Sequence, residues 1–204
     1  MIYSIITCGV GGQGLMLVSN IIGIACAEYE YNIRTAETHG LAQRSGSIYT
    51  HIRMSETEQI YSPLIPYGEA DVMLAMEAIE ALRNIEFLKS EGLIVLNDYI
   101  WHPVQETFNR VKEPKQTYIT IDEIIQKLHE ITNTIFKIDA LKIANEAGNA
   151  LASNVALLGF LANTENFPFT LDQLKPIVSQ VVPKKAVDIN IKALELGYNA
   201  TSTG

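Results

Sequence analysis

The pattern of hydrophobic and polar positions predicts that the chain begins with a strand, a turn and a helix. Residues 2–7 form a short apolar run rich in β-branched residues, which is typical of a strand buried on both faces. A glycine-rich stretch, GVGGQG at 9–14, follows this run almost directly. Apolar residues then recur every three or four positions over 15–29, which predicts a helix with one face packed on a sheet.

Further along the chain, the pattern alternates between strands and helices. Apolar or alternating runs predict strands at 31–36, 47–54, 59–61, 71–76, 93–97 and 134–138, with 59–61 as a short edge strand. Helical spacing predicts helices at 77–89, 121–130, 140–147, 151–163, 171–182 and 184–196. Thr120 with Glu123, and Thr170 with Gln173, are typical of capping boxes at two helix starts. We expect the proline-containing stretch at 101–115 to be irregular.

The connection between the second and third strands indicates how the sheet is built. Residues 37–46 are too few to hold a crossover helix, so the third strand should run antiparallel to the second. The loop over 37–46 should then lie at the same carboxyl edge as the glycine turn, where ligands of open α/β sheets bind. We therefore expect a three-layer, Rossmann-like α/β domain with a mostly parallel, mixed sheet and a helical C-terminal portion. One domain should span 1–204, with the α/β core at 1–138 and the helical portion at 139–198.

The glycine turn allows two interpretations. Gly9, Gly11 and Gly14 match the G-x-G-x-x-G pattern of dinucleotide-binding folds, and free N–H groups at the helix start would favour an anion. That pattern is normally supported by an acidic residue about 20 positions further on, which binds a ribose hydroxyl. Arg34 stands at that distance and Glu37 follows it, so the sequence leaves this test open. The other interpretation is a tight strand-to-helix turn that needs glycine only for its geometry.

A second candidate site is the polar loop ETHGLAQRSGS at 37–47. Its histidine, amide, guanidinium and hydroxyl groups suit a phosphate or a carboxylate at the sheet edge. In a purely structural alternative, its two glycines are turn residues and Glu37 pairs with Arg44 across the loop. Arg44 is the leading ligand candidate, because a planar guanidinium binds such anions with two hydrogen bonds. His39 has no second catalytic group at a diagnostic position, so we predict no catalytic residue.

Composition and charge narrow the function classes. Hydrophobic residues make up 48% of the 204 residues and charged residues 19%, a balance that favours a buried subunit interface. The net charge of −8 and the scattered basic residues argue against nucleic acid and membrane as partners. The start of the chain lacks a basic region with a cleavage site, and no apolar run is long enough to span a membrane, so we expect a cytoplasmic protein. Cys8 and Cys26 are isolated, and two cysteines cannot ligate an iron–sulfur cluster or build a zinc site.

Three segments together carry a family resemblance. GVGGQG at 9–14, ETHGLAQRSGS at 37–47 and EAIEALR at 77–83, in this order, resemble the gamma-type subunits of 2-oxoacid:ferredoxin oxidoreductases, and they are most similar to the indolepyruvate branch of that family. The resemblance implies a non-catalytic subunit of an enzyme that oxidatively decarboxylates an aryl 2-oxoacid to its acyl-coenzyme A and passes electrons to ferredoxin. It also implies that thiamine diphosphate, magnesium and iron–sulfur clusters belong to the alpha partner subunit, with coenzyme A as a candidate co-substrate at this chain.

The candidate ligand-binding residues come from the first two of these segments, and no metal ligand is predicted. They are Gly9, Gly11, Gly12, Gln13, Gly14, His39, Gln43, Arg44 and Ser45. Two alternatives remain: a free-standing NAD(P)-dependent dehydrogenase that uses the glycine turn, and a scaffold subunit in which neither loop touches a ligand. An isolated chain could also form a homodimer through the surface meant for its partner.

Overall fold

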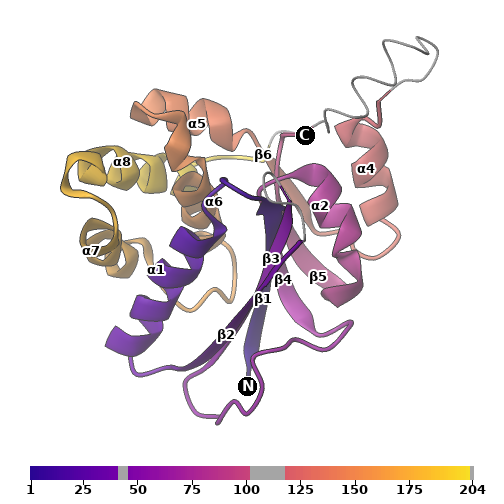
Figure 1. Ribbon diagram of the computed structural model, residues 1–204, viewed down its shortest axis with the longest axis horizontal. Coiled ribbons are helices and arrows are strands. Elements are labelled where there is room, and N and C mark those ends of the chain that lie inside the picture. The colour runs from indigo at the N-terminus through magenta and orange to yellow at the C-terminus, as the bar shows by residue number, and fades with distance from the viewer. Residues whose placement is uncertain (41–45, 102–117, 203–204) are drawn as a thin grey trace.

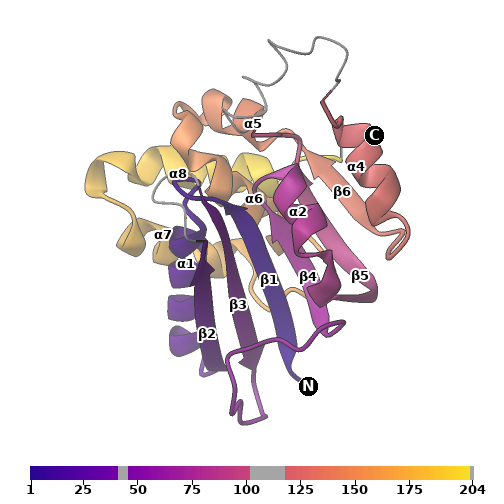
Figure 2. The same ribbon diagram turned by 45° about the vertical axis from the view of Figure 1, so that its right-hand side comes forward.

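The computed structural model shows an α/β fold in which one mixed sheet lies between two layers of helices (Figure 1). The structure describes residues 1–40, 46–101 and 118–202. The sheet has six strands in the order β2-β3-β1-β4-β5-β6, which can be followed across Figure 2. The strands are β1 (Tyr3–Val10), β2 (Asn32–His39), β3 (Ser47–Ser55), β4 (Ala70–Ala75), β5 (Leu88–Asn97) and β6 (Ile135–Ile138). The predicted fold class is confirmed.

The strand directions bring the two candidate loops to one edge of the sheet. β3 runs antiparallel to β2, as the short connection predicted, and it also pairs antiparallel with β1. β1, β4, β5 and β6 are parallel to one another. The register places Ile48 of β3 opposite both Gly9 of β1 and His39 of β2. β1, β2, β4 and β5 therefore end at the same edge of the sheet, which we call the carboxyl edge.

Helices cover both faces of the sheet. α1 and the C-terminal helices lie on one face, and α2 and α4 lie on the other (Figures 1 and 2). Alternate residues of β1 enter two separate apolar cores, with Ile5 in the first and Ile6 in the second. The helices are α1 (Leu15–Glu28), α2 (Ala78–Arg83), α4 (Ile121–Leu128), α5 (Ala140–Ala147), α6 (Ser153–Ala162), α7 (Leu171–Val181) and α8 (Val187–Tyr198), with short 3-10 helices η1 (Ile85–Phe87), η2 (Ala150–Ala152) and η3 (Lys184–Ala186). In the described ranges, no helix is both long and apolar enough to cross a membrane.

The crossing of α6 and α8 brings two backbones into direct contact. A Cβ added at Gly159 would overlap the carbonyl oxygen of Leu194, and one added at Gly197 would overlap that of Ala156. Neither position therefore has room for a side chain. This crossing packs the helical C-terminal portion onto the first apolar core, to which Ala156 and Leu194 both belong.

The structure corrects the prediction for residues 77–89. α2 ends at Arg83, and the carbonyl oxygen of Glu80 accepts both the backbone N–H of Asn84 at 3.1 Å and its side-chain amide at 2.8 Å. The chain then makes η1 and enters β5, because Phe87 and Leu88 are both buried in the second core. The strand predicted at 93–97 is accordingly longer than expected.

Smaller differences concern helix starts and one short segment. The edge strand predicted at 59–61 is wrong, since this segment is irregular and is anchored by the buried side chain of Ile60. The helices predicted at 151–163 and 184–196 each begin with a 3-10 turn. Both predicted capping boxes, at the starts of α4 and α7, are confirmed. The stretch expected to be irregular at 101–115 lies, after Trp101, outside the described residues.

Candidate functional site

The glycine turn after β1 uses its glycines differently from the turn that the G-x-G-x-x-G pattern predicts. Gly9 belongs to β1, and a Cβ there would lie 2.6 Å from the side-chain oxygen of Gln13. Gly12 and Gly14 have φ angles of 102° and 80°, which side-chain-bearing residues rarely adopt. Gly12 is exposed, and its N–H has no backbone partner among the described residues. The turn therefore leaves a backbone donor exposed just before α1.

Gln13 is committed to the turn itself. Its side-chain oxygen accepts a 2.7 Å hydrogen bond from the N–H of Val10, and its amide nitrogen lies 3.5 Å from the carbonyl oxygen of Met76. The side chain thus ties the end of β1 to the residue that follows β4. Of the predicted ligand-binding residues, Gln13 has its polar groups occupied by the fold.

Gly14 is fixed by a residue far away in the sequence. The side-chain amide of Asn154, at the start of α6, donates a 3.0 Å hydrogen bond to the carbonyl oxygen of Gly14, and a Cβ on Gly14 would overlap that amide. Asn154 is 2% exposed, and its oxygen accepts the N–H of Val155 at 2.9 Å. The amide is therefore a buried, satisfied group that holds the turn against the C-terminal helices.

The second predicted loop contacts the glycine turn directly. The N–H of Gly11 donates a 2.9 Å hydrogen bond to the carbonyl oxygen of Gly46, and the N–H of Gly40 donates a 2.8 Å bond to that of Ser47. His39 is exposed, and its Nε2 lies 3.3 Å from a carboxylate oxygen of Glu37. The predicted ligand residues Gln43, Arg44 and Ser45, and with them the alternative pair of Glu37 and Arg44, lie outside the described residues.

A third segment at this edge, EAIEALR at 77–83, carries two buried carboxylates that the sequence did not suggest as site residues. Glu77 and Glu80 are each 1% exposed. Glu77 caps α2 by accepting the N–H of Glu80 at 2.8 Å, and its other oxygen accepts the N–H of Trp101 at 2.8 Å. Glu80 accepts the hydroxyl of Ser47 at 2.5 Å and the guanidinium of Arg83 at 2.5 Å. The three segments that carried the family resemblance are therefore bonded to one another.

Burial dominates the electrostatics around these carboxylates. It raises the pKa of Glu77 above its usual value, although backbone N–H donors from Trp101 and Glu80 oppose the shift. It also raises the pKa of the Cys8 thiol, and the carboxylates of Glu80 and Glu77 add to that effect. Cys8 is therefore a buried, protonated thiol with little nucleophilic character.

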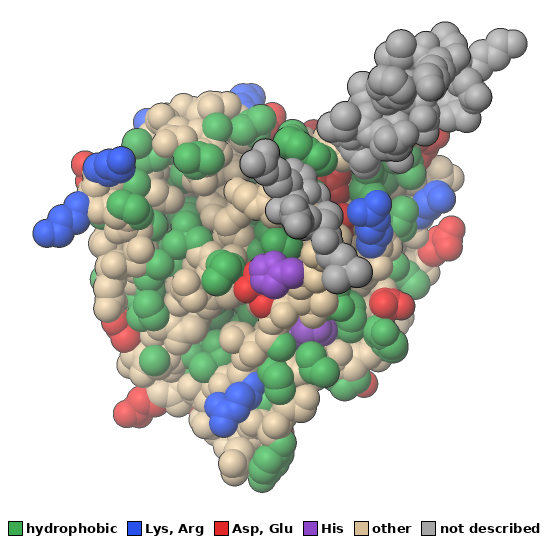
Figure 3. Space-filling model, in the orientation of Figure 1, with side chains coloured by type: hydrophobic (Ala, Val, Ile, Leu, Met, Phe, Trp, Pro, Cys, Tyr) green, Lys and Arg blue, Asp and Glu red, His purple; other side chains and the backbone are tan. Residues whose placement is uncertain are grey.

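A cavity of about 360 Å³ opens at the carboxyl edge on the side of α1, α5 and α6. Gly11 and Gly12 form one wall, and aromatic and aliphatic side chains form the others, among them Tyr99, Trp101 and Leu151. Trp101 is 44% exposed and Leu151 is 79% exposed, so apolar surface continues from the cavity onto its rim. On the face in Figure 3, lysine and arginine side chains are scattered and do not form one basic patch. The cavity suits a ligand with a planar or apolar part and an anionic part that the turn can reach.

The topology separates the expected ribose-binding position from the glycine turn. β3 lies between β1 and β2, so β2 is two strands, or roughly 10 Å, away from β1. Arg34 pairs with Arg53, which pairs with Ser4, and this row lies toward the other end of β1 from the turn. The Arg34 side chain donates to the carbonyl oxygen of Ile33 on the surface. Arg34 is not part of the candidate site.

Comparison with known proteins shows which family has this arrangement. The family described as pyruvate ferredoxin/flavodoxin oxidoreductase matches residues 4–200. The chain belongs to this family. The resemblance predicted from the three segments is confirmed.

Relatives within the family are similar over nearly their whole length. The indolepyruvate oxidoreductase subunit IorB of Archaeoglobus fulgidus is 39% identical over 201 residues, which cover 98% of this chain and 96% of that protein. The subunit of the same name from Methanothermobacter thermautotrophicus is 36% identical and covers 99% of both chains. The crystal structure of the gamma subunit of a keto/oxoacid ferredoxin oxidoreductase from Geobacter sulfurreducens has a TM-score of 0.70 at 18% identity and covers 97% of this chain and 95% of its own. The match to this crystal structure supports the α/β fold described above for the present chain.

Proposed function

We propose that this chain is the gamma-type subunit of an indolepyruvate-class 2-oxoacid:ferredoxin oxidoreductase, and that its carboxyl edge completes the coenzyme A site of the assembled enzyme. The chain is a subunit of an oxidoreductase complex that uses 2-oxoacids and ferredoxin, and it is not active alone. The indolepyruvate assignment rests on the two relatives at 39% and 36% identity, both of which are named as indolepyruvate oxidoreductase subunits.

The observation that supports the coenzyme proposal is one cavity at the carboxyl edge. It is lined by the glycine turn, by Asn97, Tyr99 and Trp101 at the end of β5, and by Leu141, Ala150, Leu151 and Ser153 of the C-terminal portion. The N–H of Gly12 provides a donor for an anionic group, in line with the positive end of the α1 dipole. Tyr99 and Trp101 provide aromatic surface for a planar ring, and Leu151 provides apolar surface. Coenzyme A contains both an adenine ring, which suits the aromatic side chains, and a diphosphate group, which suits the N–H of Gly12.

The redox and carbanion chemistry is assigned to the alpha partner subunit. The only two cysteines of the chain, Cys8 and Cys26, are buried in the second and first apolar cores, on opposite faces of the sheet, so they cannot share a cluster. Among the described residues, no group of three or more His, Cys, Asp or Glu side chains could hold a metal ion. In the proposed complex, thiamine diphosphate supplies the carbanion chemistry and iron–sulfur clusters carry the electrons to ferredoxin. This chain's residues bind and orient coenzyme A and exclude water from the site.

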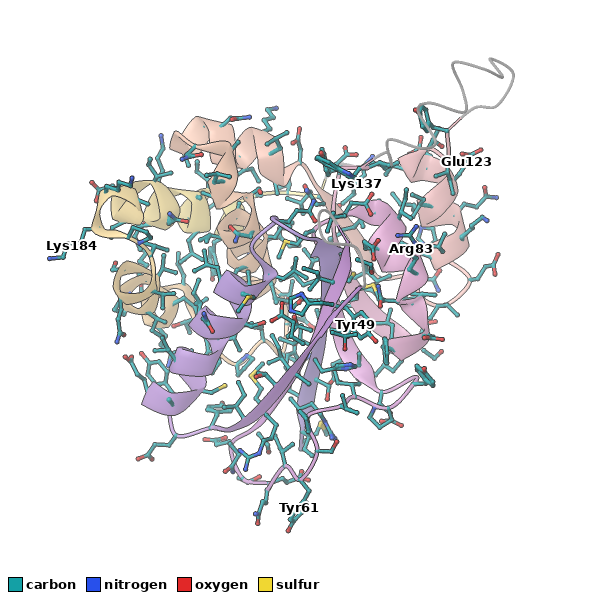
Figure 4. All side chains as sticks on the ribbon, viewed as in Figure 1. Tyr49, Tyr61, Arg83, Glu123, Lys137 and Lys184 are labelled. Atoms are coloured by element: carbon teal, nitrogen blue, oxygen red, sulfur yellow. The ribbon has the colours of Figure 1, made fainter. Side chains whose placement is uncertain are left out.

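The proposal is tested in the complex assembled with the alpha partner subunit. Trp101→Ala should raise the KM for coenzyme A roughly tenfold, because stacking on an aromatic side chain contributes about 1–3 kcal/mol per base. The kcat and the KM for the 2-oxoacid should stay near the wild-type values. Tyr61→Ala is the matched control, since Tyr61 is an aromatic residue that is 86% exposed at the opposite edge of the sheet, where Figure 4 labels it.

Two results would favour the alternatives. Loss of assembly by Trp101→Ala, with unchanged kinetics in the complex that still forms, would support a scaffold subunit. Calorimetric binding of NAD⁺ or NADP⁺ by the purified chain would support a dinucleotide-binding dehydrogenase, which the position of β3 between β1 and β2 argues against.

A further inference from the structure

Glu80 is a buried carboxylate that the proposed coenzyme contacts do not use. It is 1% exposed, and a carboxylate removed from water is costly unless it is paired and hydrogen-bonded. A helix of this fold could fill the same position with an apolar side chain. The contacts of Glu80 therefore indicate what it does for the carboxyl edge.

Among the residues that the structure describes, each carboxylate oxygen of Glu80 has one partner. One oxygen accepts the guanidinium of Arg83 at 2.5 Å, and the other accepts the hydroxyl of Ser47 at 2.5 Å. Arg83, labelled on α2 in Figure 4, has a side chain that is 57% exposed, so it balances the buried charge from the solvent side. Ser47 is the first residue of β3, and it directly follows Gly46, whose carbonyl oxygen accepts the N–H of Gly11.

These bonds form a continuous chain from α2 to the glycine turn. Glu80 holds the side chain of Ser47, the backbone next to Ser47 holds Gly11, and Gly11 and Gly12 form a wall of the cavity. The ends of strands are where backbone pairing opens most easily, and Ser47 stands at such an end. A hydrogen bond to a buried charged group is among the stronger ones available to fix that position.

We propose that Glu80 is a positioning residue, which clamps the start of β3 through Ser47 and thereby holds the glycine turn in the geometry that binds coenzyme A. The ligand half of this inference rests on the proposed function. The clamp itself depends only on the contacts of Glu80, Ser47 and Arg83. It is not a contact with coenzyme A, so its removal should change affinity and leave the chemical step unaltered.

The test uses Ser47→Ala, Ser47→Thr and Glu80→Gln in the complex with the alpha partner subunit. Ser47→Ala removes the clamp and leaves the pair between Glu80 and Arg83 intact, whereas Ser47→Thr keeps the hydroxyl. The matched control is Glu195→Gln, which removes a carboxylate from a surface ion pair with Lys175 on the helices of the opposite face. Hydrogen exchange of peptides covering residues 9–15 reports the clamp, and the KM for coenzyme A reports its consequence.

We expect Ser47→Ala to speed exchange at the Gly11 amide by about tenfold or more and to raise the KM for coenzyme A by a similar factor, with kcat within about twofold. Ser47→Thr and Glu195→Gln should match the wild type. Unchanged exchange in Ser47→Ala would overturn the inference whatever the kinetics. Faster exchange with an unchanged KM would refute the ligand half of the inference, whereas the coenzyme A site itself is tested separately by Trp101→Ala. If Glu80→Gln fails to fold, Ser47→Ala still decides.

Discussion

The contact between Gly14 and Asn154 allows a stability prediction that separates two effects of one substitution. Gly14 has a positive φ of 80°, and a Cβ at this position would overlap the side-chain amide of Asn154. Gly12 lies two residues earlier with a φ of 102°, but a Cβ there would meet nothing within 4 Å. Gly12→Ala therefore reports backbone strain alone, and Gly14→Ala reports strain together with the clash.

The magnitudes follow from the two geometries. An alanine in the left-handed region costs about 1–2 kcal/mol, which is the whole expected loss for Gly12→Ala. Overpacking against a buried side chain adds about 1–3 kcal/mol, so Gly14→Ala should lose about 2–5 kcal/mol. Asn154→Ala alone removes the two side-chain hydrogen bonds to Gly14 and Val155 and should lose about 1–3 kcal/mol.

The double variant Gly14→Ala with Asn154→Ala should be more stable than the sum of its parts predicts. Removing the Asn154 amide frees the space that the new Cβ needs, so only the backbone strain and the two lost hydrogen bonds remain. We expect a coupling free energy of about 1–3 kcal/mol in favour of the double variant. The pair Gly12→Ala with Asn154→Ala should instead be additive within about 0.5 kcal/mol.

Urea denaturation of the purified chain, followed by circular dichroism, measures all five variants on one scale. The m-values should agree among the variants, so that differences in midpoint report stability. The reasoning would be refuted if Gly14→Ala cost no more than Gly12→Ala, or if Asn154→Ala failed to rescue it. Either result would mean that the turn and α6 are not in contact in solution.

Three further predictions concern the rest of the fold. Gly159→Ala should destabilise the chain by about 3 kcal/mol or more, because the backbones of α6 and α8 are in contact at that position. Gly23→Ala should stabilise the chain by about 0.5–1 kcal/mol, because a Cβ at this position of α1 would meet nothing within 4 Å. Urea midpoints measure both changes. Burial lowers the pKa of His51 below its ordinary value of 6.5, so the unfolded chain binds a proton at a higher pH than the folded chain does, and the free energy of unfolding should fall as the pH drops below about 6.5. Urea midpoints measured at a series of pH values should show this fall. A His51→Gln variant should show a smaller fall over the same pH range. Burial raises the pKa of Cys8 and raises that of Cys26 to about 12, so iodoacetamide should label neither thiol until the chain is unfolded, as mass spectrometry can show.

The elements that the sequence predicted well are those set by local chemistry. The first strand, turn and helix follow from a β-branched run, glycines and helical spacing, and the two capping boxes follow from hydroxyl and acidic or amide side chains three positions apart. The meeting of the two loops at one edge followed from the length of a single connection. Each of these depends on residues that are close in sequence.

The features that were missed depend on contacts between distant segments. Asn154 and Gly14 are 140 positions apart, and no local pattern links an amide in an apolar helix to a glycine turn. Glu77 and Glu80 have the spacing of an ordinary helix, where charged residues normally face solvent. Only the fold shows that both are buried and that Ser47 and the N–H of Trp101 are their partners. One indication of their importance was present in the sequence, since both glutamates lie in the segment EAIEALR at 77–83, which carries part of the family resemblance.

The position of β3 separates this glycine turn from the strand arrangement that a dinucleotide site uses. In a dinucleotide fold the second strand lies beside the first and brings an acidic residue to the ribose. Here β3 occupies that place, and its first residue Ser47 and the preceding Gly46 lie at the edge instead. Glu80 and Glu77 bond to the neighbouring loops from the side of β4. β3 thus fills the carboxyl edge on the side where a dinucleotide fold binds the ribose. The edge is open toward Trp101 and Leu151, whose exposed apolar surface is not covered by other described residues. A ligand bound there would be only partly enclosed, which is the geometry expected of a site that a partner subunit completes.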